Sequence, residues 1–265
     1  MKNFFGLPIR SLEPTSLILL VFFFLSGCTN EGPVGPPGAP NDFSPGNVNS
    51  ANVDTDLGLL SKKMEKFFFD DFNSGDADHW NPRGGTWKIT DGQYIGEGTT
   101  DTSSDCDILK NQALIRDLEG CDVDIRLDMK SIQRVDKLLV LRSVNPGNQI
   151  ELNFRAERPG AFAADLIVQE RTNCHFILHT PEFSVLIPPH QVGQTIHTRT
   201  LLIGRRVLVW IDNVLVLNRL FPIAVRKARI GLGVIEQGVT AFDNVKVHVL
   251  RREPTPTGQQ LSGSE

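Results

Sequence analysis

Short runs of apolar residues, many of them alternating with polar residues, recur along the chain. In one clear case Val123, Ile125, Leu127 and Met129 alternate with charged residues. Period-two alternation is typical of a strand with one buried face. Similar runs, rich in Val, Ile, Leu or Phe, lie at residues 66–72, 86–90, 123–129, 138–142, 149–155, 164–170, 197–203, 207–211, 214–217, 228–234 and 240–249.

These runs predict an all-β domain. About a dozen short strands over some 185 residues fit a two-sheet antiparallel β-sandwich, and this length buries enough apolar surface for independent folding. Two dipeptides between runs, Asp91-Gly92 and Asp212-Asn213, are typical of hairpin turns. We therefore predict one β-sandwich domain over residues 66–250.

The N-terminal segment has the layout of a secretion signal. Lys2 and Arg10 precede nine consecutive apolar residues, 17–25, and a helix of that length spans only about 14 Å of a bilayer core of about 30 Å. Residues 25–28, Leu-Ser-Gly-Cys, resemble the lipobox of bacterial lipoproteins. The resemblance implies that residues 1–27 are removed and that Cys28 carries a lipid. Attachment to the bacterial cell envelope follows, with the outer membrane as the default, whereas the alternative is an uncleaved anchor with an incidental Cys.

Residues 28–65 are predicted to form a tether. Nine of the 22 residues from 29 to 50 are Gly or Pro, without apolar periodicity, which is typical of a spacer rich in polyproline II conformation. Three Gly-X-Y triplets at 32–40 are too few to predict a collagen triple helix. The polar segment 251–265 is predicted to be a disordered tail.

Composition adds one exclusion. The 265-residue chain has 27 Lys and Arg against 31 Asp and Glu, for a net charge of -4. A nucleic-acid-binding domain normally presents a basic face, so this mild acidity argues against a nucleic-acid partner.

Several motifs of the domain resemble the concanavalin A-like lectin/glucanase superfamily. They lie at 69–73 (FDDFN), 85–92 (GTWKITDG), 204–213 (GRRVLVWIDN), 229–233 (RIGLG) and 241–247 (AFDNVKV). The laminin-G-like and 3-keto-disaccharide hydrolase-like domains are the most similar members. The resemblance implies a jelly roll whose first and last strands pair, with residues 70–72 beside 242–247.

One predicted strand carries most of the candidate binding side chains. Alternation places Glu151, Asn153 and Arg155 on one side of it, and carboxylate, amide and guanidinium groups suit sugar hydroxyls. A solvated outer face is the alternative. The resemblance places Arg142 on the concave sheet, while Trp210 either stacks on a sugar there or fills the core.

The same strand lacks the catalytic pattern of the glucanases in this superfamily, Glu-x-Asp-x-x-Glu. Asn153 replaces the middle acid after Glu151, and the last acid, Glu157, comes one residue late. Six residues of extended strand separate the two Glu residues by about 20 Å, whereas a retaining glycosidase needs about 5–5.5 Å. The sequence therefore favours a domain without enzymatic activity.

Calcium is the cofactor that the resemblance suggests, because domains of the superfamily often carry it. Asp70, Asp71 and Asp243 would converge if the terminal strands pair, and carboxylate oxygens suit Ca²⁺. The alternative is that these carboxylates cap turns by accepting hydrogen bonds from backbone amides.

Three cysteines remain if Cys28 is lipidated, so one disulfide would leave one thiol unpaired. Cys106 and Cys121 close the shortest loop and are the first choice, while the pairings with Cys174, and no disulfide at all, stay open.

These features predict a lipid-anchored domain of the cell envelope that binds carbohydrate or another cell-surface ligand. One alternative is an enzyme of the keto-disaccharide hydrolase type, with Glu151 and His175 converging. The other is a structural or adhesive laminin-G-like module with a flat apolar patch and no pocket.

Overall fold

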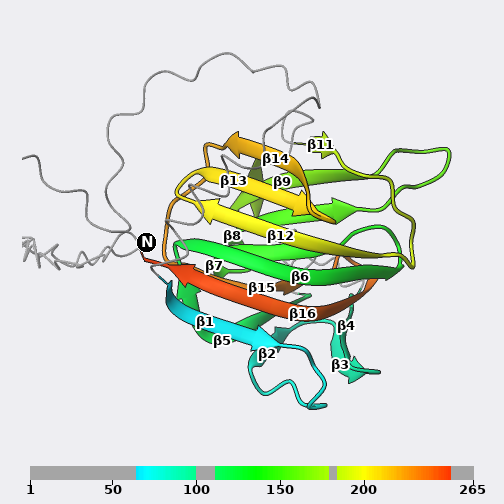
Figure 1. Cartoon of the computed structure of the whole chain (residues 1–265), viewed down its shortest axis with the longest axis horizontal. Helices are drawn as coiled ribbons and strands as arrows, with labels where there is room; N and C mark the ends of the chain where they lie inside the picture. Colours follow the sequence, from blue (N-terminus) through cyan, green and yellow to red (C-terminus); the bar gives the residue numbers. More distant parts are fainter. Residues whose placement is uncertain (1–63, 100–110, 179–183, 252–265) are drawn as a thin grey trace, which may run out of the picture.

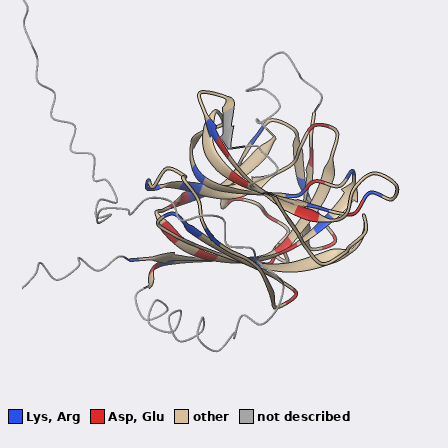
Figure 2. Ribbon diagram, turned by 90° about the horizontal axis from the view of Figure 1, so that it is seen from above, with Lys and Arg blue, Asp and Glu red and all other residues tan. Residues whose placement is uncertain are grey.

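The computed structural model describes residues 64–99, 111–178 and 184–251, and within these ranges the chain forms strands and loops without helices. The described part of the chain therefore includes no helix that would cross a membrane. The strands form two antiparallel sheets of eight strands each, which confirms the predicted β-sandwich. In Figure 1 sheet A lies in front of sheet B, and the edge-on view of Figure 2 shows the two as separate layers.

Sheet A has the strand order β14-β13-β12-β6-β16-β4-β3, with β1 also paired to β16. Its strands are β1 (Met64–Asp70), β3 (Thr86–Thr90), β4 (Gln93–Glu97), β6 (Asp122–Gln133), β12 (Thr195–Ile203), β13 (Arg206–Ile211), β14 (Val214–Leu220) and β16 (Val239–Leu250).

Sheet B has the order β10-β9-β8-β7-β15-β5-β2, with β11 also paired to β9. Its strands are β2 (Trp80–Arg83), β5 (Gln112–Gly120), β7 (Leu138–Asn145), β8 (Asn148–Arg155), β9 (Asp165–Thr172), β10 (His175–Leu178), β11 (Ser184–Leu186) and β15 (Ala228–Gly233).

The first and last strands pair, as the resemblance implied. β1 runs antiparallel to β16, with Asp70 opposite Val245 and Met64 opposite Leu250. The first and last residues of the sandwich therefore lie side by side, at the same end of this strand pair.

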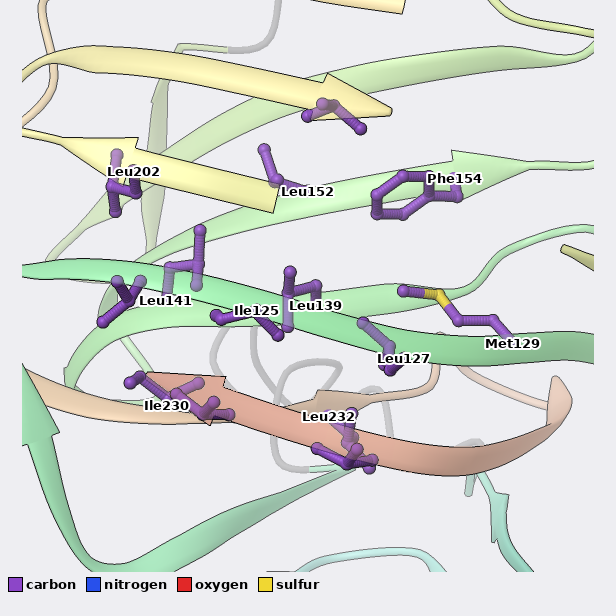
Figure 3. Close-up of a cluster of buried hydrophobic side chains, with 14 of the residues drawn as sticks. Ile125, Leu127, Met129, Leu139, Leu141, Leu152, Phe154, Leu202, Ile230 and Leu232 are labelled. Atoms are coloured by element: carbon purple, nitrogen blue, oxygen red, sulfur yellow. The ribbon is translucent and has the colours of Figure 1, made fainter. Parts of the chain in front are cut away.

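The core lies between the facing sides of the two sheets. Alternate residues of each strand interdigitate there, which is how two stacked sheets exclude water. Figure 3 shows the centre of this core, where Ile125, Leu127, Met129 and Leu202 of sheet A meet residues of sheet B. The partners from sheet B are Leu139, Leu141, Leu152, Phe154, Ile230 and Leu232.

Both predicted hairpin turns are present. Asp91 and Gly92 have φ of 51° and 69°, and Asp212 and Asn213 have φ of 49° and 66°. Positive φ at both central residues defines the type I′ turn, whose twist matches that of the flanking strands. These turns join β3 to β4 and β13 to β14.

Five strands were not predicted from the sequence: β2, β4, β5, β10 and β11. β2 contains Pro82, β4 contains Gly96, and both residue types weaken a strand signal. β5 has a run of four buried residues at its start and no regular alternation. A bulge described below breaks its period.

Candidate functional site

The side of β8 that faces away from the core is polar. Ile150, Leu152 and Phe154 point into the core, so Gln149, Glu151, Asn153 and Arg155 lie on the opposite side. The predicted grouping of Glu151, Asn153 and Arg155 on one side of a strand is therefore present. β9 adds residues to the same side, and we call the whole set the polar face: Gln149, Glu151, Asn153, Arg155, Asp165, Gln169 and Arg171.

Glu151 is the centre of a buried network on the polar face. One carboxylate oxygen accepts a hydrogen bond from Gln149 Nε2 at 2.6 Å, and the other lies 3.5 Å from Arg171 Nε. Ser143 Oγ of β7 donates to Gln149 Oε1 at 3.1 Å. The Arg171 guanidinium compensates the buried charge of Glu151, so the carboxylate is held in one position.

Asn153 and Gln169 have amide oxygens without a partner. Asn153 donates its Nδ2 to Asp136 Oδ1 at 2.8 Å. Its Oδ1 and the Oε1 of Gln169 are both buried, and no hydrogen-bond donor reaches either of them among the described residues. Asn153 and Gln169 lie on neighbouring strands, and Gln169 is directly opposite Glu151. Buried polar atoms are normally satisfied, so each of these two acceptors calls for a donor such as a water molecule or a ligand.

Arg155 and Asp165 form a bidentate ion pair at one end of the polar face. Arg155 Nε lies 2.6 Å from Asp165 Oδ1, and a second contact joins Nη2 to Oδ2. The hydrogen bond to Asp165 is the main cause of a raised pKa of the Arg155 guanidinium. The guanidinium also lies over the ring of Phe162, 4.7 Å from its centroid. Arg155 is therefore fixed and charged.

A cavity of about 560 Å³ lies on the same side of sheet B as the polar face, but beside β5 and β2, across the sheet from β8 and β9. A row of paired residues leads from the polar face to it, in the order Gln169, Glu151, Val140, Gly231, Leu114 and Asn81. Leu114 and Asn81 line the cavity. The volume is within the range of about 300–1,000 Å³ found for ligand pockets.

The cavity is shaped by a bulge in β5. Leu114 pairs with Gly231 and Glu119 pairs with Arg229, so the four residues 115–118 of β5 oppose Ile230 alone. Asp117 within the bulge has φ of 55°. A bulge of this kind bends its strand and turns side chains out of the pleat. Arg116 and Asp117 are accordingly exposed.

Arg142 does not belong to the polar face, contrary to the prediction. It has φ of 47° where the pairing of β7 with β8 is irregular, and this bulge turns the side chain toward sheet A. The guanidinium, almost completely buried, donates to the carbonyl oxygens of Cys121, Gly204 and Ala224 at 2.6–3.1 Å. Arg142 therefore links three connections between strands, those that contain Cys121, Gly204 and Ala224, at one end of the sandwich.

Trp210 lies on the other sheet. Val209 and Ile211 point into the core, whereas Trp210 points away from it on β13. There it packs near Leu208 and under the guanidinium of Arg199, 5.1 Å from the ring centroid. Trp210 is separated from Glu151 by the whole core, so the two cannot contact one ligand molecule in the predicted way.

The three aspartates predicted for calcium have backbone partners. Asp70 accepts hydrogen bonds from the backbone N of Phe72 and from Trp80 Nε1, Asp71 accepts from Asn73 N, and Asp243 accepts from Asn244 N. These contacts correspond to the alternative stated with the calcium prediction. Burial raises the pKa of Asp243, and the charges of Asp128, Asp71 and Asp70 add to this effect. Across the described ranges, no group of three or more His, Cys, Asp or Glu residues is placed to hold a metal ion.

Cys121 and Cys174 each take part in a disulfide. Cys106 and Cys28 lie outside the described residues, so the pairing of Cys106 with Cys121 and the lipidation of Cys28 stay predictions.

Two parts of the site were not predicted from the sequence. Gln169 and Arg171 carry only a weak signal, because Leu166 and Val168 alternate with Asp165, Ile167 and Gln169, whereas Glu170 breaks the pattern before Arg171. The cavity carried no such signal, since it depends on a bulge and on side chains from four separate strands, β1, β2, β5 and β15.

Solved structures of other proteins share this fold. The carbohydrate-binding module CBM66 from Bacillus subtilis superposes with a TM-score of 0.51 at 20% identity, covering 63% of this chain and 94% of that one. A protein of unknown function with a galectin-like fold, also from Bacillus subtilis, gives a TM-score of 0.52 at 10% identity, covering 72% and 99%. At these identities the likeness concerns the fold alone. Neither a family model nor a curated protein matches the sequence.

Proposed function

We propose that this chain is a carbohydrate-binding domain that recognises its glycan along the polar face of sheet B. The observation that carries the proposal is the pair of buried, unpartnered amide oxygens, Asn153 Oδ1 and Gln169 Oε1. A sugar hydroxyl supplies the missing donor, and each hydroxyl also accepts a hydrogen bond from a neighbouring group. The carbohydrate-binding module named above has the same fold, which supports the proposal by analogy.

The surroundings of these oxygens also suit a sugar. Leu138 and Val140 of β7 and Leu114 of β5 lie on the same side of the sheet. Gly231 and Gly233 of β15 lie between them. A largely apolar floor beside a few fixed polar groups is the usual composition of a ligand site.

The acids of the polar face support binding rather than hydrolysis. Both oxygens of Glu151 have partners, and Asp165 is held by Arg155. A glycosidase needs a pair of carboxylates free to act as nucleophile and acid. His175 lies on β10 opposite Thr172, and no contact among the described residues joins it to Glu151. The enzymatic alternative therefore receives no support from the geometry.

We propose in addition that a lipid on Cys28 holds the domain in the bacterial cell envelope. This part rests on the sequence 25–28, Leu-Ser-Gly-Cys, after an apolar run. Growth of an expressing bacterium with an azide-labelled fatty acid should label the protein, and Cys28→Ala should abolish the label. A labelled C28A variant would disprove attachment at this residue.

The carbohydrate proposal is tested with a polysaccharide panel. The full chain, purified in detergent, is assayed for binding to neutral polymers (levan, xylan, mixed-linkage β-glucan) and to acidic polygalacturonate. Asn153→Leu and Gln169→Leu should each weaken the binding of any retained polymer about tenfold, because one hydrogen bond to a buried acceptor is lost. Asn218→Leu on sheet A is the matched control and should bind like the wild type.

Circular dichroism and melting curves show whether each variant is folded. The proposal is wrong if no polymer is retained, or if folded N153L and Q169L variants bind as tightly as N218L.

A further inference from the structure

The cavity beside β5 is unusually rich in positive charge. Its lining includes Lys66, Arg116, Lys227 and Arg229. Two acids, Asp117 and Glu119, also line it, which leaves an excess of two positive charges. The chain as a whole is acidic, with a net charge of -4, so this local excess runs against the general charge.

The four cations are not neutralised by their contacts. Arg116 Nε donates to the Trp80 carbonyl oxygen at 2.8 Å, and Arg229 Nη2 donates to the Val144 carbonyl oxygen at 2.9 Å. Lys66 Nζ lies 3.5 Å from the Asp117 carbonyl oxygen. Within the described residues, none of the four takes part in an ion pair, although two acids lie in the same cavity. Carbonyl groups therefore orient Lys66, Arg116 and Arg229 and leave their charge available.

A fifth cation, Arg83, lies close to Arg229 of the cavity. Burial and the charge of Arg83 both lower the pKa of the Arg229 guanidinium, and Glu119 only partly opposes them. Mutual repulsion of this kind is relieved when an anion binds between the cations. Arg229 also links the cavity to the polar face, since it pairs with Ser143, whose hydroxyl donates to Gln149.

We propose that this cavity binds an acidic substituent, a carboxylate or a sulfate, of the glycan that lies on the polar face. The inference rests on the proposed function and names its ligand class: an acidic polysaccharide rather than a neutral one. A guanidinium and an ammonium group together offer the bidentate and point-charge contacts that such oxyanions require. One extended polysaccharide chain would follow the row of paired residues from Gln169 to Asn81 and so contact both parts of the site.

The first test compares two ligands that differ only in charge. Polygalacturonate carries a carboxylate on each sugar, and its methyl ester has the same backbone without the charge. We expect the full chain to bind polygalacturonate at least about tenfold more tightly than the ester at low salt, with the difference shrinking as the salt concentration rises. Dextran sulfate against dextran forms a second pair and shows whether sulfate serves instead of carboxylate.

The second test removes single charges. Lys227→Gln and Arg229→Gln should each weaken the binding of the acidic polymer about fivefold to tenfold and leave the binding of its neutral counterpart unchanged. Lys88→Gln and Arg126→Gln are matched controls, because both residues are exposed on sheet A. No hydrogen bond or ion pair holds Lys227 among the described residues, so K227Q should fold even if R229Q does not.

The outcomes separate the two proposals. Equal binding of acidic and neutral polymers, unchanged in K227Q and R229Q, would overturn the inference and leave the carbohydrate-binding proposal standing. No binding of any polymer would overturn both. Equal binding of polygalacturonate and duplex DNA would also overturn the inference, because it would show unspecific attraction of polyanions.

Discussion

Lys137 Nζ lies 3.0 Å from His190 Nε2, and both side chains are buried. His190 Nδ1 lies 3.1 Å from the carbonyl oxygen of Pro188, so Nδ1 carries the proton and Nε2 accepts. Lys137 is therefore the donor of the shared hydrogen bond. The backbone of Lys137 pairs with Phe154 just before β7, and alternation places its side chain on the core side, like that of Leu139.

The first prediction follows from the charge of this amine. Burial lowers the pKa of Lys137 from 10.5 to about 7, and Asp136 opposes this shift. Between about pH 7 and 10.5 the unfolded chain binds a proton that the folded chain lacks, so stability should rise with pH over this window. Burial also lowers the pKa of His190, so further stability should be lost as the pH falls below 6.5.

Lys137→Met removes the titrating amine and should therefore remove the rise in stability between about pH 7 and 10.5. Melting curves at pH 7, 8.5 and 10 should show the wild type gaining stability relative to K137M as the pH rises. Parallel curves for the two proteins would show that the buried amine stays charged.

The second prediction concerns the bond between Trp80 and Asp70. Trp80 Nε1 donates to Asp70 Oδ2 at 2.7 Å, and the indole is fully buried. Trp80→Phe leaves the carboxylate oxygen without this donor and should cost about 1–3 kcal/mol of stability in urea unfolding. Trp87→Phe is the control, because Trp87 Nε1 donates to Gly84 O in an exposed position, and it should cost less. A larger loss in W87F would contradict this account.

The third prediction separates Arg142 from ligand binding. Arg142→Lys cannot reach the three carbonyl oxygens that the planar guanidinium holds together. We expect a loss of about 2–4 kcal/mol, measured by chemical denaturation, and unchanged glycan affinity of the folded variant. Arg126→Lys, at an exposed position, should change stability little. Weakened glycan binding by folded R142K would restore Arg142 to the site.

The fourth prediction concerns the turn between β13 and β14. Asn213 has φ of 66°, a conformation that a β-branched residue adopts only with strain. Asn213→Val should therefore be less stable than Asn213→Gly by about 1–2 kcal/mol. The two midpoints of thermal unfolding are compared directly, and equal values would mean that the turn relaxes into another form.

Much of the fold was predictable because its alternation is regular. β3 was located without error, and the order of apolar positions in β6, β8 and β13 indicated which residues enter the core. The Asp-Gly and Asp-Asn dipeptides marked two hairpins, since type I′ turns require residues that tolerate positive φ. The polar side of β8 was predictable for the same reason, because one residue in two must point away from the core.

What failed depended on long-range pairing. The resemblance placed Arg142 on the concave sheet, but the residue lies where the pairing of β7 with β8 is irregular, which a strand pattern in the sequence does not reveal. Trp210 neither fills the core nor lies on the polar face, because the sequence does not show which sheet receives β13. The bulge of β5 obscured both that strand and the cavity beside it. Gln169 became a candidate only once β9 was seen to pair with β8.

The pairing of Met64 with Leu250 has a consequence for how such a domain can be joined to others. Because the two ends of the sandwich are opposite one another in a strand pair, a linker of a few residues would bridge them. New ends could then be opened at the exposed Asp212-Asn213 turn to give a circular permutant with every strand intact. The same geometry would let the sandwich be inserted into a surface loop of a host protein with little change in the spacing of the loop's ends.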